Sequence, residues 1–439
     1  MKKNLLFGMG ALLIVAVACS KSDDVEEVTN EPNSTEEEPA KPTYVEPKTR
    51  VDIVMTPQES VVNDAANQFS LKFFEQMVKN SNAGSNIFVS PFSAQAALSM
   101  TANGARNETL DEMLTALNMK GFGLDDINQY NQTIIKAIAD LDNTTFVESA
   151  NGIWSKVNLL ESFSSKMQEV YDAKVEKTDF SREALIAIND WASEKTHGMI
   201  PELYNVDEGV SPYLMVVLAN ALYFNAVWKE PFYKELTTKG SFFTTGKDGA
   251  IPIDMMKEGG YRNYLQCETF DLCEKPYGNG AFSMVFLLPH ESIVLSQCIS
   301  DLAKKDWNTL TTSLEKSYSL VNLTVPKFEW KDLQYDLIPS LKAMGMQVPF
   351  TGNADFRNMT DEADLLIGAV DQYTALTLNE QGTQAAAITK VEVEATSNGG
   401  EEPNPVDFTL NRPFALLIKE KSTGVILFAG AVNNVLRTN

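Results

Sequence analysis

The sequence has few of the residues on which most enzymes depend. Among its 439 residues there are two histidines, His197 and His290, and four cysteines. It contains no nucleophile elbow, phosphate-binding loop, His-Glu-x-x-His pair or Cys-x-x-Cys pair. Hydrolytic nucleophiles usually act beside a histidine, so this scarcity argues against a hydrolase. We expect no enzyme activity, no cofactor and no bound metal; a hydrolase that uses His197 or His290 is the remaining enzymatic hypothesis.

Basic residues are outnumbered by acidic ones. Lys and Arg total 36 against 59 Asp and Glu, which gives a formal net charge of −23. This charge argues against nucleic acid as a partner and against a basic patch that binds anionic membranes. Hydrophobic residues make up 44% of the chain, enough for a large core. No second linker interrupts residues 58–439, so we expect one large, monomeric domain behind an N-terminal tail.

The apolar run near the N-terminus is too short to span a membrane. Lys2 and Lys3 precede the apolar residues 5–17, and Ala18-Cys19 follows. A charged start, a short apolar stretch and small residues at the cut are typical of a signal peptide, whereas a membrane-spanning helix needs about 20 apolar residues. The sequence therefore predicts an exported protein whose residues 1–18 are a signal peptide.

The end of this segment, Ala16-Val17-Ala18-Cys19, resembles the lipobox of bacterial lipoproteins. The resemblance implies that Cys19 is lipidated and that its acyl chains hold the protein on the outer membrane. The acids that begin at Asp23 resemble a surface-export signal, so the domain is expected to face either the cell surface or the periplasm. A plain secretory signal with an incidental cysteine is the alternative.

The tail that follows has the composition of a disordered segment. Residues 19–57 are rich in Glu, Pro, Thr and Ser and poor in aromatic residues. Such a segment cannot bury enough apolar surface to fold. We expect a lipidated N-terminus followed by a flexible acidic tether.

Residues 376–397 carry the most informative pattern in the chain. Alternate residues from position 383 are small or β-branched, namely Thr383, Ala385, Ala387, Thr389, Val391 and Val393. The residues between them are mostly polar or charged, so the pattern predicts a half-buried strand. Loop-forming residues follow Ser397, and three consecutive alanines have little strand propensity. An ordinary strand and turn is the simplest interpretation, but the alanines favour a segment with a second conformation.

The same stretch, Glu380-Gln381-Gly382-Thr383-Gln384-Ala385-Ala386-Ala387, resembles the reactive-loop hinge of the serpins. This resemblance implies an α+β serpin fold with three β-sheets, about nine helices and an exposed reactive-centre loop that can insert into the main sheet. It also implies a suicide-substrate inhibitor of serine proteases, with cysteine proteases as a second class, and a covalent complex with the target protease. The hinge residues are then Glu380, Gly382, Thr383, Ala385, Ala386 and Ala387.

Other segments extend the resemblance over residues 58–439. Ser90-Pro91 resembles the start of a buried helix under the main sheet, with Ser90 as N-cap. The apolar run 213–224 resembles a central strand buried on both faces. The family often has a histidine eight residues before the hinge glutamate, where this chain has Gln372. The resemblance assigns a sheet-opening region to Ser90, Ser93, Asn220, Trp228 and Gln372.

The position of the reactive bond depends on the end from which it is counted. The fourteenth residue after Gly382 is Thr396, which places the cut between Thr396 and Ser397. Counting back from Pro413 places it nearer to Gly399–Glu402, at a bond between Ser397 and Glu402. We prefer the first position because the length that inserts is set from the hinge. Threonine is small and uncharged, which suits elastase-like or subtilisin-like targets.

Two alternatives remain open at this point. The long tip 397–405 and Gln372 would also fit a non-inhibitory serpin-fold binding module at the surface. A disulfide between Cys267 and Cys273 would be compatible with export. Free buried thiols are the favoured interpretation, because the family needs no fixed bridge.

Overall fold

The computed structural model describes residues 45–244, 249–383 and 404–436. The α-helices in these ranges are α1 (Pro57–Asn80), α2 (Pro91–Gly104), α3 (Asn107–Ala116), α4 (Leu124–Ile138), α5 (Glu161–Tyr171), α6 (Arg182–Lys195), α7 (Leu295–Ala303), α8 (Trp307–Lys316) and α9 (Ile338–Ala343). Two short 3-10 helices are η1 (Lys234–Leu236) and η2 (Val348–Phe350). None of the helices in these ranges is long and apolar enough to cross a membrane.

The strands of the described residues pair into two sheets. They are β1 (Ile87–Val89), β2 (Thr145–Ser155), β3 (Lys174–Lys177), β4 (Val216–Val227), β5 (Thr238–Phe243), β6 (Ala250–Gln266), β7 (Phe270–Pro276), β8 (Phe282–Pro289), β9 (Tyr318–Pro326), β10 (Phe328–Asp336), β11 (Asp371–Leu378), β12 (Gly382–Thr383), β13 (Val406–Thr409), β14 (Phe414–Glu420) and β15 (Ile426–Val432). One sheet has the order β10-β11-β12-β4-β2-β3. The other has the order β1-β15-β14-β8-β7-β6-β9-β13, with β5 paired to β6.

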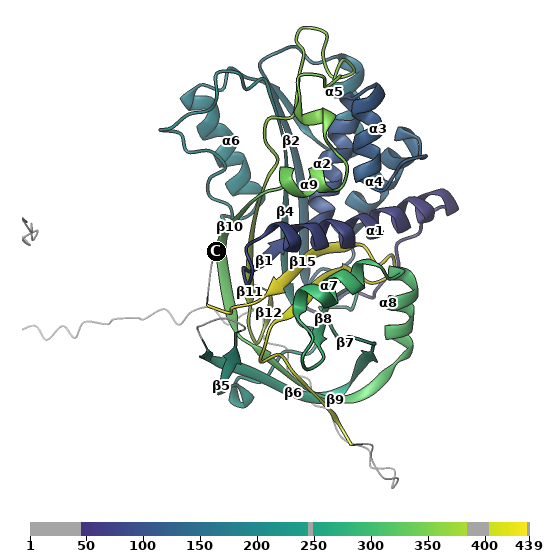
Figure 1. The fold of residues 1–439 in the computed structure, drawn as a ribbon, viewed down its shortest axis with the longest axis vertical. Helices are drawn as coiled ribbons and strands as arrows, with labels where there is room; N and C mark the ends of the chain where they lie inside the picture. The colour runs from purple at the N-terminus through teal and green to yellow at the C-terminus, as the bar shows by residue number, and fades with distance from the viewer. Residues whose placement is uncertain (1–44, 245–248, 384–403, 437–439) are drawn as a thin grey trace, which may run out of the picture. The chain divides into compact units, whose positions relative to one another are not determined.

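The long strand β6 explains why two sheets form where three were expected. Its first part pairs with β5, its middle pairs with β9, and its last three residues pair with β7. The second and third sheets of the prediction are therefore joined into one continuous sheet. In Figure 1, β6 and β9 cross the lower part of the domain, below the helices.

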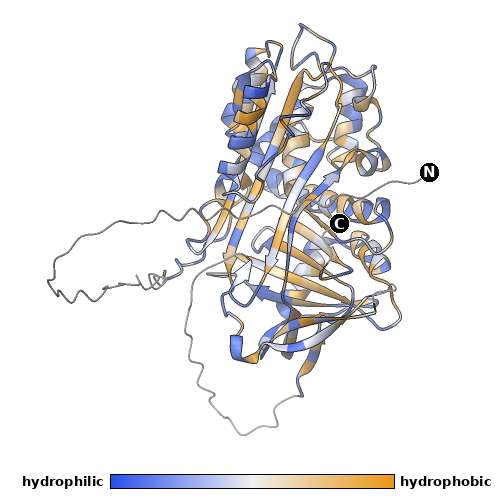
Figure 2. Ribbon diagram, turned by 90° about the vertical axis from the view of Figure 1, so that its left-hand side faces the viewer, coloured by the Kyte–Doolittle hydropathy of each residue, from blue (hydrophilic) through white to orange (hydrophobic). Residues whose placement is uncertain are grey.

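The core lies between the two sheets and the helices around them. Every residue of β8, β14 and β15 is buried, as expected for apolar strands covered on both faces. Helices α1 and α2 pack against β15 of the nine-stranded sheet. Helix α6 packs against β2 and β4 of the six-stranded sheet (Figure 1). Figure 2 shows orange, apolar strands inside and helices with alternating blue and orange faces. The fold thus buries its apolar strands under amphipathic helices.

The start of α2 confirms the sequence prediction for this helix. Ser90 is the N-cap, its Oγ accepts a hydrogen bond from the N–H of Ser93, and Pro91 stands at the first helical position. Helix α1 begins with a capping box, in which Thr56 and Glu59 bond each other's backbone N–H groups. Such caps satisfy backbone donors that would otherwise have no partner at a helix start.

The central strand β4 departs from its prediction. We expected residues 213–224 to be buried on both faces. The strand instead begins at Val216, Tyr213 is 86% exposed, and Leu218, Asn220 and Leu222 are only half-buried. The physical reason is that β4 lacks a full-length neighbour on one side, because β12 covers only its last two residues.

The end of the expected tether contacts the domain. The backbone N–H of Lys48 donates to Asn143 Oδ1 at 2.8 Å, and Lys48 Nζ lies 2.7 Å from Asp140 Oδ1. Farther along, the N–H of Ile53 donates to Ser422 Oγ at 3.0 Å. Lys48 and Ile53, which fall within the predicted tether, are therefore bonded to the domain.

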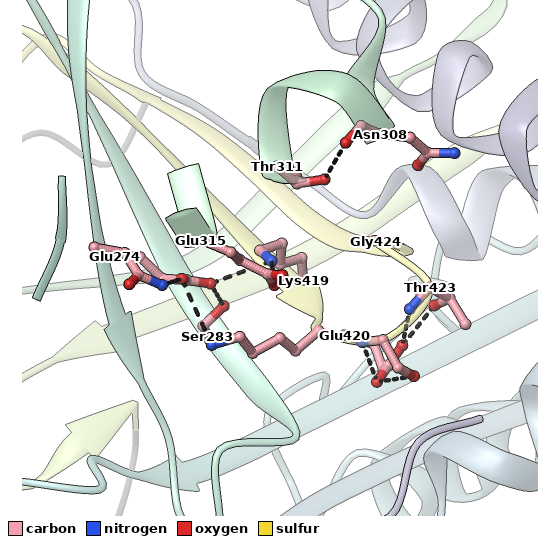
Figure 3. Close-up of polar contacts among 12 residues, drawn as sticks. Glu274, Ser283, Asn308, Thr311, Glu315, Lys419, Glu420, Thr423 and Gly424 are labelled. Carbon is pink, nitrogen blue, oxygen red and sulfur yellow. Dashed lines mark hydrogen bonds and ion pairs between the residues drawn. The ribbon is translucent and has the colours of Figure 1, made fainter. Parts of the chain in front are cut away.

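A buried ion cluster links β7, β8 and β14 (Figure 3). Glu274 accepts hydrogen bonds from Ser283 and Asn263, each at 2.6 Å, and Lys419 Nζ lies 3.2 Å from its carboxylate. Burial raises the pKa of Glu274, but Lys419 and Lys421 outweigh it and lower the pKa to about 2. Glu274 is therefore ionised at neutral pH and is paired inside the sheet, as a buried charge must be.

Candidate functional site

The described part of the predicted hinge forms a strand between β11 and β4. After β11 the chain turns at Asn379, whose Oδ1 accepts a hydrogen bond from the N–H of Gln381 at 2.9 Å. Thr383 then pairs with Leu378 of β11 and with Ala226 of β4. The hinge therefore occupies the first positions between two strands of the six-stranded sheet.

Gly382 is required where the turn passes into β12. Its φ of +152° is rarely adopted by residues with a side chain, and a Cβ there would lie 2.0 Å from the carbonyl oxygen of Ala226. The close approach of the two backbones thus depends on glycine at this position.

Two aromatic residues, Trp228 and Tyr277, form hydrogen bonds with the hinge. The ring of Trp228 stacks on that of Tyr277 at a centroid distance of 4.2 Å, and both side chains are almost fully buried. Trp228 Nε1 donates to the carbonyl of Asn379 at 3.1 Å, and its backbone N–H donates to that of Gln381 at 2.8 Å. The Tyr277 hydroxyl lies 2.7 Å from the Thr383 hydroxyl. Burial raises the pKa of Tyr277, so this hydroxyl keeps its proton.

The buried hinge carboxylate, Glu380, forms an ion pair with an exposed lysine. Its Oε2 lies 2.8 Å from Lys327 Nζ, and its Oε1 accepts a hydrogen bond from Thr237 at 3.1 Å. Burial raises the pKa of Glu380, but the contacts with Lys327 and Thr237 outweigh it and hold the pKa below its usual value. The carboxylate is therefore charged at neutral pH and links the hinge to the segment between β9 and β10.

A cavity continues the line of β12 along the sheet. Among the described strands, β4 and β11 are joined only through β12. The cavity beyond Thr383 is bordered by Thr374 of β11, by Leu222 and Phe224 of β4, and by Met199 of the segment after α6. The cavity thus lies between β4 and β11, in line with β12.

The opposite half of β11 is held by Gln372. Its Oε1 accepts a hydrogen bond from the N–H of Ser90 at 2.8 Å, and its Nε2 donates to the carbonyl of Ser90 at 2.9 Å. The next inward residue, Thr374, donates to the carbonyl of Phe88. A glutamine amide can both donate and accept, so Gln372 fixes β11 to the N-cap of α2.

The same N-cap connects to β4 through polar side chains. The Ser93 hydroxyl bonds Asn220 Oδ1, and Asn220 Nδ2 donates to Asn151 Oδ1 of β2 at 2.7 Å. Ser90 and Ser93 therefore lie between Gln372 of β11 and Asn220 of β4. The network spans the two strands between which a further strand would have to enter.

The structure thus brings together four of the five residues assigned to the sheet-opening region: Ser90, Ser93, Asn220 and Gln372. It places Trp228 beside the hinge instead. Glu380, Gly382 and Thr383 are in contact with their surroundings as described. The remaining predicted positions, Cys19, Ala385, Ala386, Ala387, Thr396 and Ser397, lie outside the described residues.

Three residues at the hinge were missed by sequence reasoning: Tyr277, Lys327 and Asn379. Tyr277 lies 106 positions from its partner Thr383, and Lys327 lies 53 positions from its partner Glu380. Each directly follows a strand, β7 or β9, that only the fold brings to the hinge. Only Asn379, three residues before Gly382, carried a local signal, because asparagine often bonds the backbone two residues on.

In the described residues each histidine contacts a carboxylate and the cysteines are free thiols. His197 contacts Glu148 at 3.2 Å, and His290 contacts Asp271 at 2.8 Å. Cys267, Cys273 and Cys298 form no disulfide. Burial raises the pKa of Cys273 to about 12, so this thiol is protonated and unreactive. No group of three metal-ligating side chains occurs within the described ranges.

Comparison with known proteins identifies one family. The model of the serpins, serine protease inhibitors, matches residues 64–435. The leukocyte elastase inhibitor of Sus scrofa is 32% identical over 385 residues, which cover 84% of this chain and 98% of that protein. Native tengpin, a thermophilic serpin, superposes with a TM-score of 0.75 at 28% identity, over 89% of this chain and 97% of its own. Human thyroxine-binding globulin superposes with a TM-score of 0.74 at 26% identity, over 87% and 100%.

Replacing Gln372 tests the link between β11 and α2. Gln372→Leu removes both hydrogen bonds to Ser90, and the buried N–H of Ser90 loses its acceptor. We therefore expect the free energy of unfolding to fall by about 2 kcal/mol. Urea unfolding measures the change. Gln266→Leu, at an exposed position of β6, is the control, and an equal loss in both variants would contradict a specific role for Gln372.

Replacing Glu380 tests the ion pair at the hinge. At about pH 7, Glu380→Gln should lower the free energy of unfolding by about 1–2 kcal/mol. Because the pKa of Glu380 lies below 4.5 in the folded protein, the wild-type advantage should be fully present above that pH and disappear as the pH falls further. Unfolding midpoints of both proteins across this pH range give the difference. Glu268→Gln, at an exposed turn, should show neither effect, and a difference that persists in acid would exclude the ion pair as its cause.

Proposed function

This chain belongs to the serpin family, and on that premise we propose that it inhibits proteases as a suicide substrate. Relatives of the chain include coagulation and elastase inhibitors. The observation that carries the proposal is the placement of Gly382 and Thr383 between β4 and β11, with a cavity in line beyond them. The hinge is thus at the start of the path that an inserting loop would follow.

Insertion would proceed along that path after cleavage. The protease cuts the loop and forms its acyl-enzyme bond, and the freed segment then enters between β4 and β11. The alternate residues of this segment that would face inward, such as Ala385 and Ala387, are small, which suits a cavity bordered by aromatic side chains. The attached protease is carried along with the segment, and its active site is distorted before the ester can be hydrolysed.

Backbone hydrogen bonds supply much of the driving force. β11 has eight residues, and a new strand that paired with it and with β4 would add on the order of ten hydrogen bonds. At about 1 kcal/mol each, these bonds stabilise the inserted form by on the order of 10 kcal/mol. The native form is therefore held by a kinetic barrier, to which the Gln372 network and the hinge contacts contribute.

The proposed targets are serine proteases with small, uncharged specificity pockets. This specificity rests on Thr396 and on the absence of Lys and Arg between Val391 and Asn411. Cysteine proteases are a second class. A non-inhibitory binding module is the competing function; the similarity to thyroxine-binding globulin is an observation that favours it.

Trapping can be tested on the chain that begins at Ser20, with neutrophil elastase, subtilisin, trypsin and papain. We expect a complex of elastase or subtilisin that survives denaturing gels, with a cut after Thr396 in the released peptide. Thr383→Arg should be cleaved at the wild-type rate but form at least about tenfold less complex, because it places a charge in the insertion path. Thr312→Arg, at an exposed position of α8, is the control. Clean cleavage by all enzymes, without a complex or a gain in thermal stability, would favour the binding module.

We also propose that the protein is an outer-membrane lipoprotein anchored through Cys19. The support is the lipobox-like sequence and the acidic residues that follow it. Cys19→Ala should move the protein from the membrane fraction to the soluble fraction, since the acyl chains provide the anchor. Ser20→Ala keeps the cysteine and should remain in the membrane fraction. Identical fractionation of both variants would refute lipid anchoring, and protease digestion of intact cells would distinguish the cell surface from the periplasm.

A further inference from the structure

A lysine of β7, Lys275, is buried close to the hinge. Its side chain is only 2% exposed, and its Nζ donates to both carboxylate oxygens of Glu258 on β6, at 2.6 and 2.7 Å. Glu258 also pairs with Arg262, and these two side chains are 10% and 9% exposed. A buried ammonium group is costly unless each of its three donors has a partner. Two of the donors of Lys275 are thus held by Glu258.

The third donor of Lys275 reaches the segment that connects β4 to η1. Nζ donates to the carbonyl of Glu230 at 2.8 Å. It also lies 4.2 Å from the ring centroid of Phe232 and 5.3 Å from that of Trp228. A cation beside an aromatic ring is attracted to it, most strongly where water is excluded. We call residues 228–232 the clamp segment; Lys275 bonds its backbone and contacts its two buried aromatic rings.

The clamp segment forms backbone hydrogen bonds with the hinge turn. The N–H of Trp228 donates to the carbonyl of Gln381 at 2.8 Å. The N–H of Phe232 donates to the carbonyl of Glu380 at 2.9 Å. β12 follows directly after this turn and pairs with the last two residues of β4. The position of β12 between β4 and β11 therefore depends on the position of the clamp segment.

The two halves of the clamp segment contact β7 in different ways. The first half is attached through the backbone, since the N–H of Lys229 donates to the carbonyl of Pro276 at 3.0 Å. The second half, from Glu230 to Phe232, contacts β7 through the side chain of Lys275. The N–H of Phe232, which bonds the hinge turn, is therefore positioned by a buried side chain of the neighbouring sheet.

We propose that Lys275 is a positioning residue for loop insertion, because it holds the clamp segment in the place that seats β12 between β4 and β11. The consequence for trapping rests on the proposed function. A strand whose first residues are already paired has only to extend, whereas an unpaired strand must first lose the entropy of closing a loop. In the proposed mechanism, insertion competes with hydrolysis of the acyl-enzyme. A β12 that is less firmly seated should therefore release more cleaved inhibitor for each enzyme trapped.

Lys275→Met is the variant that tests this role. It removes the bond to the Glu230 carbonyl and the cation beside the aromatic rings, and it leaves an unbranched apolar side chain in their place. Arg262 still pairs with Glu258, so the change leaves no buried carboxylate without a partner. Lys275→Arg is the conservative variant, because it keeps the charge and the donors. We expect both variants to fold.

Lys419→Met is the matched control (Figure 3). Lys419 lies on β14 of the same sheet, is fully buried and pairs with Glu274. In this variant Lys421 can still neutralise Glu274, from which it lies 3.8 Å away. The chemical change is thus the same as in Lys275→Met, but it is made in a different ion cluster. A general loss of stability, measured by urea unfolding, should affect both variants alike.

Hydrogen exchange on the uncleaved chain that begins at Ser20 measures how firmly the hinge is seated. In Lys275→Met, we expect the amides of Trp228 and Phe232 to exchange at least about tenfold faster than in the wild type. Lys275→Arg and Lys419→Met should stay near the wild-type rate. Wild-type exchange at both amides in Lys275→Met would overturn the proposal. Equally fast exchange in Lys419→Met would do the same, because the effect would then be one of general stability.

Trapping by subtilisin or neutrophil elastase gives the second readout. Lys275→Met should be cleaved at the wild-type rate, since the predicted cut lies fourteen residues beyond Gly382. The number of inhibitor molecules consumed per trapped enzyme should rise about threefold to tenfold, and an unchanged number would contradict a role in insertion. A wild-type chain that traps no enzyme would refute the proposed function instead. Hydrogen exchange, which needs no protease, would then still decide whether Lys275 seats β12.

Discussion

Two strands that run side by side without a common ladder are the constraint on which the structure depends. β4 and β11 point in the same direction, and the two residues of β12 are the part of the described chain that pairs with both. Backbone groups along such edges are ready to pair with a further strand. The polar network at the N-cap of α2 and the hinge contacts at the other end hold the separation in place. A sheet built in this way leaves backbone groups of β4 and β11 available to one additional strand, as the proposed insertion requires.

The two ends of this space are held by different kinds of contact. At the hinge, the N–H of Trp228 donates to the carbonyl of Gln381, and the N–H of Phe232 donates to the carbonyl of Glu380. These contacts involve only backbone groups. At the other end, side-chain amides and hydroxyls carry the connection. In the proposed insertion, the backbone contacts would be exchanged for those of a ladder, whereas the side-chain network would have to be broken.

Much of the hinge could be predicted from the sequence because its signals are local. Gly382 and the alternation that begins at Thr383 appear within a few residues, and the N-cap at Ser90 is a local motif as well. Tyr277 and Lys327 could not be found in this way, since only the fold brings β7 and β9 to the hinge. The burial predicted for β4 was too high for a related reason. An apolar run shows that a segment is hydrophobic, but only the sheet topology shows that β4 lacks a full-length neighbour on one side.

The position of the β14–β15 hairpin determines when the domain can be completed. These strands are the last in the described chain. In the sheet, however, they lie between β8 and β1, which is the first strand in chain order. The long-range pairing makes the fold slow to form. A ribosome must therefore have added residue 432 before β1 can pair fully with β15, so this edge of the nine-stranded sheet cannot be completed earlier.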